Sequence, residues 1–136
     1  MLLNLKILPV DIVWDKRGDI PSNDFADCEI AWSSFKKPAR IFTHKWSGLI
    51  REGSRDEELS KRVHPTQKPV GLHSELLLEY SKEEEVIMDL FGGSGTTLIA
   101  CEKTGRKCLM MELDATYCDV IIKRWEAFTG NKAQKL

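Results

Sequence analysis

The sequence predicts an α/β fold built on a partial Rossmann-like unit, with a mostly parallel sheet and flanking helices. Two short apolar runs, residues 86–91 and 107–113, are each followed by a stretch with helical spacing of apolar residues. Three glycines, at positions 92, 93 and 95, directly follow the first run. Strand, glycine turn, helix, strand and helix in this order form a βαβα unit, which implies parallel strands joined by a crossover helix.

The N-terminal part, residues 1–42, is predicted to be rich in strands. Residues 9–14 and 29–35 are enriched in β-branched and aromatic side chains, and the segment between them has the Gly, Pro, Asn and Asp content of a loop. Residues 43–68 show no clear period and are predicted to be a long charged loop.

The C-terminal part, residues 69–130, has the clearer pattern. A leucine-rich helix is expected from Pro69 to about residue 81, and the runs 86–91 and 107–113 are predicted to be buried strands. A helix after the glycine turn should stop at Gly105. Asp114 is a suitable N-cap for a last helix that ends at Gly130. These three parts and the tail 131–136 are expected to form a single domain.

Composition excludes several classes of protein. The chain has 136 residues, 42% of them hydrophobic, and a net charge of −1, which suits one globular domain. No window reaches the ~18 apolar residues of a membrane span, and the N-terminus lacks the cleavage site of a secretory signal. The four cysteines form no C-x-x-C pair, so neither a disulfide framework nor a metal site is expected, and a reduced cytoplasm fits best.

Charge is unevenly distributed along the chain. Residues 36–62 carry a net charge of +4 and the remaining residues carry −5. Such a stretch can follow a phosphate backbone, although a solvated loop has the same composition. The candidate nucleic-acid-binding residues in it are Lys36, Lys37, Arg40, Lys45, Trp46 and Arg51.

The segment most indicative of chemistry is DLFGGSGTT, residues 89–97. It lies where a strand opens into a helix, at which a nucleotide-like cofactor can approach glycine backbone and unpaired N–H groups. Glu112 ends the next strand, 19 residues after Gly93, the spacing at which an acidic side chain reaches ribose hydroxyls. The segment lacks the third glycine of a G-x-G-x-x-G pattern and has no G-K-[ST] sequence, which disfavours a dinucleotide or a P-loop and favours S-adenosylmethionine.

Three motifs in order then resemble one family. HPTQKP at residues 64–69, DLFGGSGTTLIA and GRKCLMMELDATY are similar to the amino-methylating DNA methyltransferases, which modify adenine N6 or cytosine N4. The order resembles the permuted class whose cofactor-binding half is C-terminal, and the flanking segments resemble phage-type adenine methylases. The resemblance implies the S-adenosylmethionine-dependent methyltransferase fold, double-stranded DNA as substrate, and adenine N6 as the first choice of target.

The resemblance also implies roles for individual residues. Asp89 would orient the methionine end of the cofactor, Glu112 would accept hydrogen bonds from the ribose, and Phe91 and Leu113 would lie against the adenosine. Further residues would line or close the pocket: Thr66, Gln67, Lys68, Gly93, Gly95, Thr96 and Thr97.

The family's catalytic signature, Asp, Asn or Ser followed by Pro-Pro and an aromatic residue, is not found in these 136 residues. The chain is therefore expected to be the C-terminal half of a methyltransferase, with a cofactor site and no identifiable catalytic residue, and not to methylate DNA alone. Open alternatives are a cytosine-N4 methyltransferase, a non-catalytic cofactor-binding or DNA-binding module that pairs with a separate catalytic chain, and a prophage remnant.

A last expectation concerns the sheet. In the family two further strands lie between the strand before the glycine turn and the strands resembling 9–14 and 29–35. Without them the sheet would have a gap of roughly 14 Å, three steps of ~4.8 Å. Direct pairing of the run 86–91 with an N-terminal strand, a second copy, or a separate chain would relieve this, and self-association is the favoured outcome.

Overall fold

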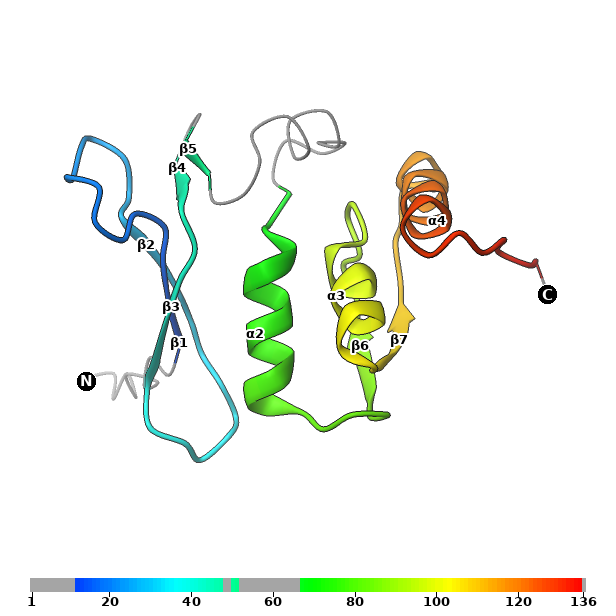
Figure 1. The fold of residues 1–136 in the computed structure, drawn as a ribbon, viewed down its shortest axis with the longest axis horizontal. Helices are drawn as coiled ribbons and strands as arrows, with labels where there is room; N and C mark the ends of the chain where they lie inside the picture. Colours follow the sequence, from blue (N-terminus) through cyan, green and yellow to red (C-terminus); the bar gives the residue numbers. More distant parts are fainter. Residues whose placement is uncertain (1–11, 48–49, 52–66, 136) are drawn as a thin grey trace, which may run out of the picture. The chain divides into compact units, whose positions relative to one another are not determined.

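The computed structural model describes residues 12–47, 50–51 and 67–135 (Figure 1). The chain divides into two compact units, Met1–Glu52 and Gly53–Leu136, and each is described by itself. Within the described ranges no helix combines the length and the apolar character needed to cross a membrane. The expectation of a single domain stays a prediction.

The first unit contains a three-stranded sheet in the order β2-β1-β3. Strand β1 (Ile12–Asp15) pairs antiparallel with β2 (Cys28–Ala31) and parallel with β3 (Arg40–Thr43). The prediction of a strand at 29–35 was too long, because the Ser33 hydroxyl oxygen accepts the Phe35 N–H and turns the chain. Strand β3 was not predicted, because its apolar part is only two residues long.

A short antiparallel pair follows the sheet. Strand β4 (Trp46–Ser47) pairs with β5 (Ile50–Arg51), so the prediction of a loop from residue 43 onward was wrong for these residues. Residues 52–66 of the same predicted loop lie outside the described residues.

The two faces of the three-stranded sheet differ in burial. Trp14 and Phe42, which are paired in register across β1 and β3, are 5% and 8% exposed. The indole Nε1 of Trp14 donates to the carbonyl oxygen of His44 at 3.0 Å. On the opposite face Ile30 and Ile41 are mostly exposed. The alternation places the core of this unit on the Trp14 face.

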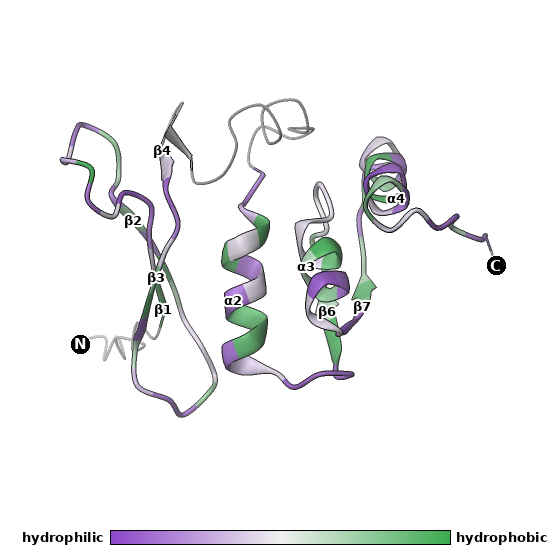
Figure 2. Cartoon of the chain, in the orientation of Figure 1, coloured by the Kyte–Doolittle hydropathy of each residue, from purple (hydrophilic) through white to green (hydrophobic). Residues whose placement is uncertain are grey.

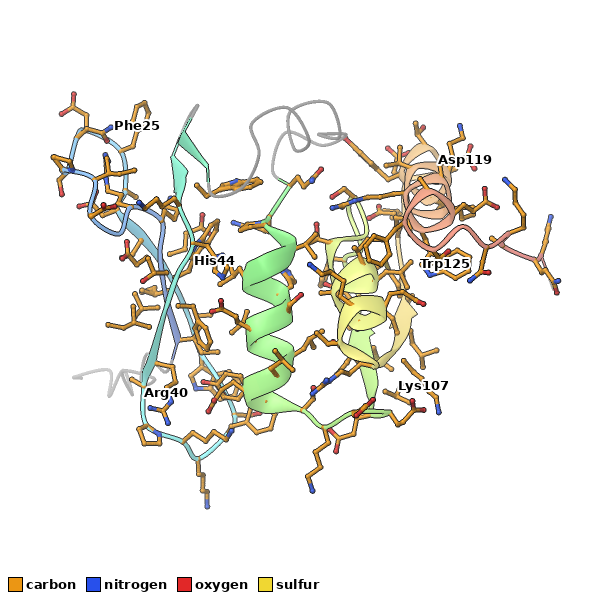
Figure 3. All side chains as sticks on the ribbon, viewed as in Figure 1. Phe25, Arg40, His44, Lys107, Asp119 and Trp125 are labelled. Atoms are coloured by element: carbon orange, nitrogen blue, oxygen red, sulfur yellow. The ribbon has the colours of Figure 1, made fainter. Side chains whose placement is uncertain are left out.

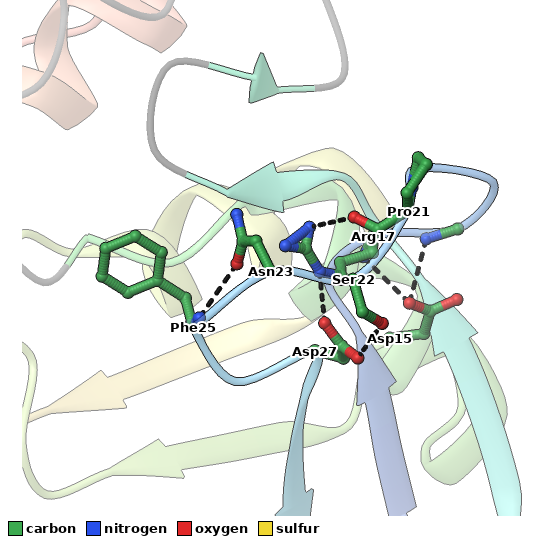
Figure 4. A network of polar contacts seen from close by, with 8 residues as sticks. Asp15, Arg17, Pro21, Ser22, Asn23, Phe25 and Asp27 are labelled. Carbon is green, nitrogen blue, oxygen red and sulfur yellow. Dashed lines mark hydrogen bonds and ion pairs between the residues drawn. The ribbon is translucent and has the colours of Figure 1, made fainter.

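A polar network shapes the turn after β1 (Figure 4). The Arg17 side chain is buried, and its guanidinium donates to the Asp27 carboxylate and to the carbonyl oxygen of Pro21. Asp15 accepts the backbone N–H groups of Arg17 and Gly18, each at 2.9 Å. These N–H donors lower the pKa of Asp15, so its carboxylate holds the turn as an anion.

The second unit confirms the predicted order of elements. It contains α2 (Val70–Tyr80), β6 (Val86–Asp89), α3 (Thr96–Thr104), β7 (Lys107–Met110) and α4 (Ala115–Thr129). Strands β6 and β7 pair in parallel, with Met88 opposite Leu109, and α3 packs against α2 and β7. The α/β class is thus confirmed, with the strands in small mixed sheets.

The predicted helix ends are found where the sequence placed them. Asp114 is the N-cap of α4, and its carboxylate accepts the Thr116 N–H at 2.7 Å. Gly105 ends α3 with φ +70° and Gly130 ends α4 with φ +75°, the left-handed conformation that glycine adopts at little cost.

The two strands of the second unit are buried on one face only. Ile87, Cys108 and Met110 are partly buried, whereas Val86, Met88 and Leu109 are more than half exposed. Figure 2 shows the apolar character of both strands. The prediction of fully buried strands was therefore half right. Among the described residues, β7 is the strand with which β6 pairs.

Candidate functional site

The candidate site lies at the carboxyl edge of β6 and β7. Because the two strands are parallel, their last residues, Asp89 and Met110, lie side by side. The loops 90–95 and 111–114 therefore begin at the same edge of the sheet. The N–H of Gly92 donates to the carbonyl oxygen of Met111 at 2.9 Å and holds the two loops together. Ligands of parallel α/β sheets bind at this edge.

The glycine turn has an open side at Gly93. Gly93 has φ +53° and Gly95 has φ +78°. A Cβ placed on Gly92 would be 2.7 Å from the Met110 side chain, and one on Gly95 would be 3.1 Å from Ile121, whereas one on Gly93 would have only a carbonyl oxygen, at 3.9 Å, within 4 Å. Gly92 and Gly95 are therefore required by packing, and Gly93 leaves backbone accessible to a ligand.

Glu112 is bound to the glycine turn. Its Oε2 accepts the N–H of Gly93 at 2.6 Å, and its Oε1 accepts the N–H of Asp114 at 3.0 Å. These two donors, that of Asp114 first, lower the pKa of Glu112. The Leu113 N–H also lowers this pKa. The two hydrogen bonds of good geometry occupy two of the about four acceptor positions of a carboxylate, so Glu112 retains capacity for hydroxyl donors.

Two large apolar side chains of the same two loops are open to solvent. Phe91 is 89% exposed and Leu113 is fully exposed. Asp89 accepts the N–H of Phe91 at 2.9 Å and thereby fixes the start of the turn. Exposed apolar residues at a loop edge are typical of a surface that a flat ring covers.

The segment before α2 contacts the same turn. Gln67 is 8% exposed, and the carbonyl oxygen of Lys68 accepts the Thr96 hydroxyl at 3.3 Å. Thr96 is the first residue of α3 and Thr97, which is half-buried, the second. The structure thus brings the backbone of Lys68 to the start of α3, and Gln67 directly precedes Lys68 in the chain. Thr66 lies outside the described residues.

Three residues of this region were not predicted. Ser94 is buried, and Arg124 of α4 donates to its carbonyl oxygen. His73 of α2 has its Nδ1 3.3 Å from the Pro69 carbonyl oxygen. Burial lowers the pKa of His73, and the charges of Lys68 and Arg124 act in the same direction, against the Pro69 carbonyl and Asp89. No local sequence pattern pointed to Arg124, because its partners in the turn are 28 and 30 residues away.

The candidate DNA-binding residues do not form one patch. Strands β1 and β3 run parallel, so Lys45 and Trp46, which follow β3, lie at the carboxyl edge of this sheet, and Arg51 pairs with Trp46. Lys36, Lys37 and Arg40 precede or begin β3 and lie at the amino edge. Figure 3 shows Arg40 and His44 at opposite ends of β3.

Lys45 has an acidic partner in this structure. Its Nζ is 2.5 Å from Asp19 Oδ1, and the hydrogen bond lowers the pKa of Asp19. Within the described ranges no group of three or more His, Cys, Asp or Glu side chains could hold a metal ion.

Comparison with known proteins decides the family. The DNA methylase family profile for N6 and N4 methyltransferases matches residues 14–124. The chain belongs to this family. It is 31% identical to the type II methyltransferase M.HinfI of Haemophilus influenzae over 89% of its length, and 29% identical to M2.LlaDCHI of Lactococcus lactis subsp. cremoris over 83%. It spans 40% of the length of each of these two relatives.

Solved structures of DNA methylases share the fold. The complex of M1.HpyAVI with S-adenosylmethionine matches with a TM-score of 0.60 and 26% identity, over 84% of this chain and 60% of the other. The cytosine-N4-specific PvuII methyltransferase matches with a TM-score of 0.62 and 19% identity, over 87% and 51%. TTHA0409 of Thermus thermophilus, complexed with S-adenosyl-L-methionine, matches with a TM-score of 0.53 and 22% identity, over 92% and 56%.

Proposed function

We propose that this chain binds S-adenosylmethionine at the carboxyl edge of β6 and β7 and serves an amino-methylating DNA methyltransferase, with adenine N6 as target. The observation that carries the proposal is the arrangement around Glu112. Its carboxylate accepts the Gly93 and Asp114 N–H groups, and the same two loops contain the open Gly93 and the exposed side chains of Phe91 and Leu113. Two similar structures contain S-adenosylmethionine.

The residues at this edge fit the parts of that cofactor. The free acceptor positions of Glu112 suit two ribose hydroxyls, and Phe91 and Leu113 offer apolar surface to the adenine ring. Gln67 and Lys68, together with Thr66 of the same motif, would close over the methionine end, where a cation suits a carboxylate. Asp89 would bind near the same end. Gly93, Gly95, Thr96 and Thr97 would line the pocket with backbone. When bound, the cofactor supplies an electrophilic methyl group.

A matched pair of carboxylates tests the site. Glu112→Gln keeps the shape but removes charge and acceptor capacity, and we expect S-adenosylhomocysteine to bind at least tenfold more weakly by titration calorimetry. Glu85→Gln is the control, because Glu85 also accepts a backbone N–H, that of Lys82 at 2.9 Å, but precedes β6 at the opposite edge. Equal affinity in the Glu112→Gln variant and wild type would place the cofactor elsewhere.

The choice of adenine and the role in restriction-modification rest on resemblance. The flanking segments resemble phage-type adenine methylases, and both curated relatives have the name of type II methyltransferases. DNA as substrate follows from the family, and four cysteines that form no disulfide suit a cytoplasmic place for such an enzyme. The test is mass spectrometry of the nucleosides from digested methylated DNA. Detection of N6-methyladenine would support adenine as the target, and detection of N4-methylcytosine would show that the target is cytosine.

The target-base motif would come from residues outside this sequence, in the same or a separate chain. Purified chain with labelled S-adenosylmethionine is therefore expected to leave DNA unlabelled. Labelling above the background without protein would show that these 136 residues contain a target-base site of their own, and would contradict a purely cofactor-binding role.

The exposed face of β6 and β7 favours an additional protein partner. Met88 is 65% and Leu109 56% exposed, opposite the face that α3 covers, and parallel sheets are normally covered on both faces. We favour a second copy over a separate chain as the cover. Sedimentation velocity should show a dimer that Met88→Asp disrupts, while Leu78→Asp on the exposed face of α2 does not. A monomer at high concentration would exclude self-association.

A further inference from the structure

Helix α4 contacts the glycine turn through one positively charged side chain. The guanidinium Nη1 of Arg124 donates to the Ser94 carbonyl oxygen at 2.9 Å, and it lies 3.2 Å from both the Ser94 and the Thr96 hydroxyl oxygens. Ser94 and Thr96 are 5% and 6% exposed. Three acceptors within the reach of one nitrogen atom therefore lie in a buried part of the cofactor edge.

The position of Arg124 has an electrostatic cost. It lies at the N-terminus of α3, the positive end of the helix dipole, where a cation is unfavourable. An apolar side chain would fill the same space without this cost. The hydrogen bonds to the turn offset it, since a buried carbonyl oxygen such as that of Ser94 would otherwise lack this donor.

The same contacts extend to the segment before α2. The Thr96 hydroxyl accepts from Arg124 and donates its own hydrogen to the carbonyl oxygen of Lys68 at 3.3 Å. A hydroxyl has one donor and two acceptor positions, so both bonds form together. Arg124, Thr96 and Lys68 thus connect α4, the glycine turn and the motif segment, which lie far apart in the sequence.

A second contact from α4 supports this arrangement. Ile121, one helical turn before Arg124, lies so close to Gly95 that a Cβ there would be 3.1 Å from it. Residues three apart lie on the same face of a helix. The face of α4 that includes Ile121 and Arg124 is therefore fitted to the glycine turn.

We propose that Arg124 is a positioning residue, which holds the glycine turn and the Gln67–Pro69 segment in the arrangement that binds the cofactor. The proposal rests on the proposed cofactor site, because the two segments it connects are the ones assigned to that site. Arg124 acts through Ser94 and Thr96 and is not assigned a contact with the cofactor.

The test compares substitutions at Arg124 with one at its neighbour. Arg124→Met removes the donors but keeps the length, Arg124→Lys keeps a charge that can reach one of the acceptors, and Lys123→Met is the control on the exposed side of α4. Binding of S-adenosylhomocysteine should weaken at least tenfold in Arg124→Met and recover in part in Arg124→Lys, and remain unchanged in Lys123→Met.

Hydrogen exchange separates positioning from loss of folding. The amides of Gly93 and Gly95 donate to Glu112 and to the Gly92 carbonyl oxygen, and they should exchange at least tenfold faster in Arg124→Met, while the amides of β7 exchange as in the wild type. Faster exchange throughout the unit would show a merely structural role and overturn the proposal. Ser94→Ala, which removes only a hydroxyl, should give a smaller local effect.

The two failures can be distinguished. If the wild type binds S-adenosylhomocysteine and Arg124→Met binds it equally well, the positioning role is wrong and the proposed function stands. If the wild type does not bind it, the proposed function fails, and local exchange at Gly93 and Gly95 decides whether Arg124 holds the turn. Thr96→Val combined with Arg124→Met should weaken binding by less than the product of the two single effects; a full product would contradict a shared network.

Discussion

The Gly93→Ala variant has two expected effects, which comparison with Gly130→Ala separates. Alanine is strained in the left-handed conformation, and its methyl group would occupy space that the cofactor needs. Gly93 has φ +53°, and its missing Cβ would meet only one carbonyl oxygen, at 3.9 Å. Alanine in the left-handed region costs about 1–2 kcal/mol, and the lower entropy of its unfolded chain offsets about 0.4–1 kcal/mol. The net loss of unfolding free energy is therefore about 1 kcal/mol, which lowers the melting temperature by roughly 4–8 °C in a domain of this size.

Gly130→Ala is the matched control. Gly130 has φ +75° with nothing within 4 Å of its Cβ position, and it lies at the far end of α4. Both variants should lose similar stability by thermal denaturation. Only Gly93→Ala should lose affinity for S-adenosylhomocysteine in calorimetry, at least tenfold or about 1.4 kcal/mol. Equal affinity in the two variants would refute the placement of the cofactor against Gly93.

Two further predictions concern stability. Asp114→Ala removes the acceptor of the Thr116 N–H at 2.7 Å and should lower the free energy of unfolding, measured with denaturant, by about 1 kcal/mol. Asp119→Ala, at an exposed position within α4, should change this free energy by less than about 0.5 kcal/mol. Equal effects would contradict the cap. Burial lowers the pKa of His73 below its ordinary 6.5. The contribution of neutral His73 to the free energy of unfolding is therefore fully present above pH 6.5 and is lost as the pH falls through the lowered pKa. His73→Gln should flatten this part of the plot of melting temperature against pH, and an unchanged slope would exclude His73 as its source.

The second unit could be predicted from sequence because local signals agree there. Asp114, Gly105 and Gly130 are caps whose chemistry needs no distant partner, and the runs at 86–91 and 107–113 have the composition of strands. Strand β3 could not be predicted in this way, because Arg40–Thr43 has a mixed composition and is fixed by pairing with β1. Pairing between distant segments leaves little local signal.

The candidate site also has a part that the sequence predicts and a part that it does not. The motif spacing singled out Gly93 and Glu112, and in the structure the Gly93 N–H donates to the Glu112 carboxylate. Arg124 was missed because its partners are a carbonyl and two hydroxyls of a turn 28 to 30 residues away, which no local pattern encodes. The charge count grouped Lys36 with Lys45, but the direction of β3 places them at opposite edges of the sheet.

Amide chemical shifts on addition of S-adenosylhomocysteine test the central claim most directly. Binding at the carboxyl edge of β6 and β7 predicts the largest shifts for Phe91, Gly93 and Leu113, and small ones for Glu84 and Glu85 at the amino edge. Saturable shifts centred on the amino edge or on the first unit, with Gly93 unchanged, would contradict it.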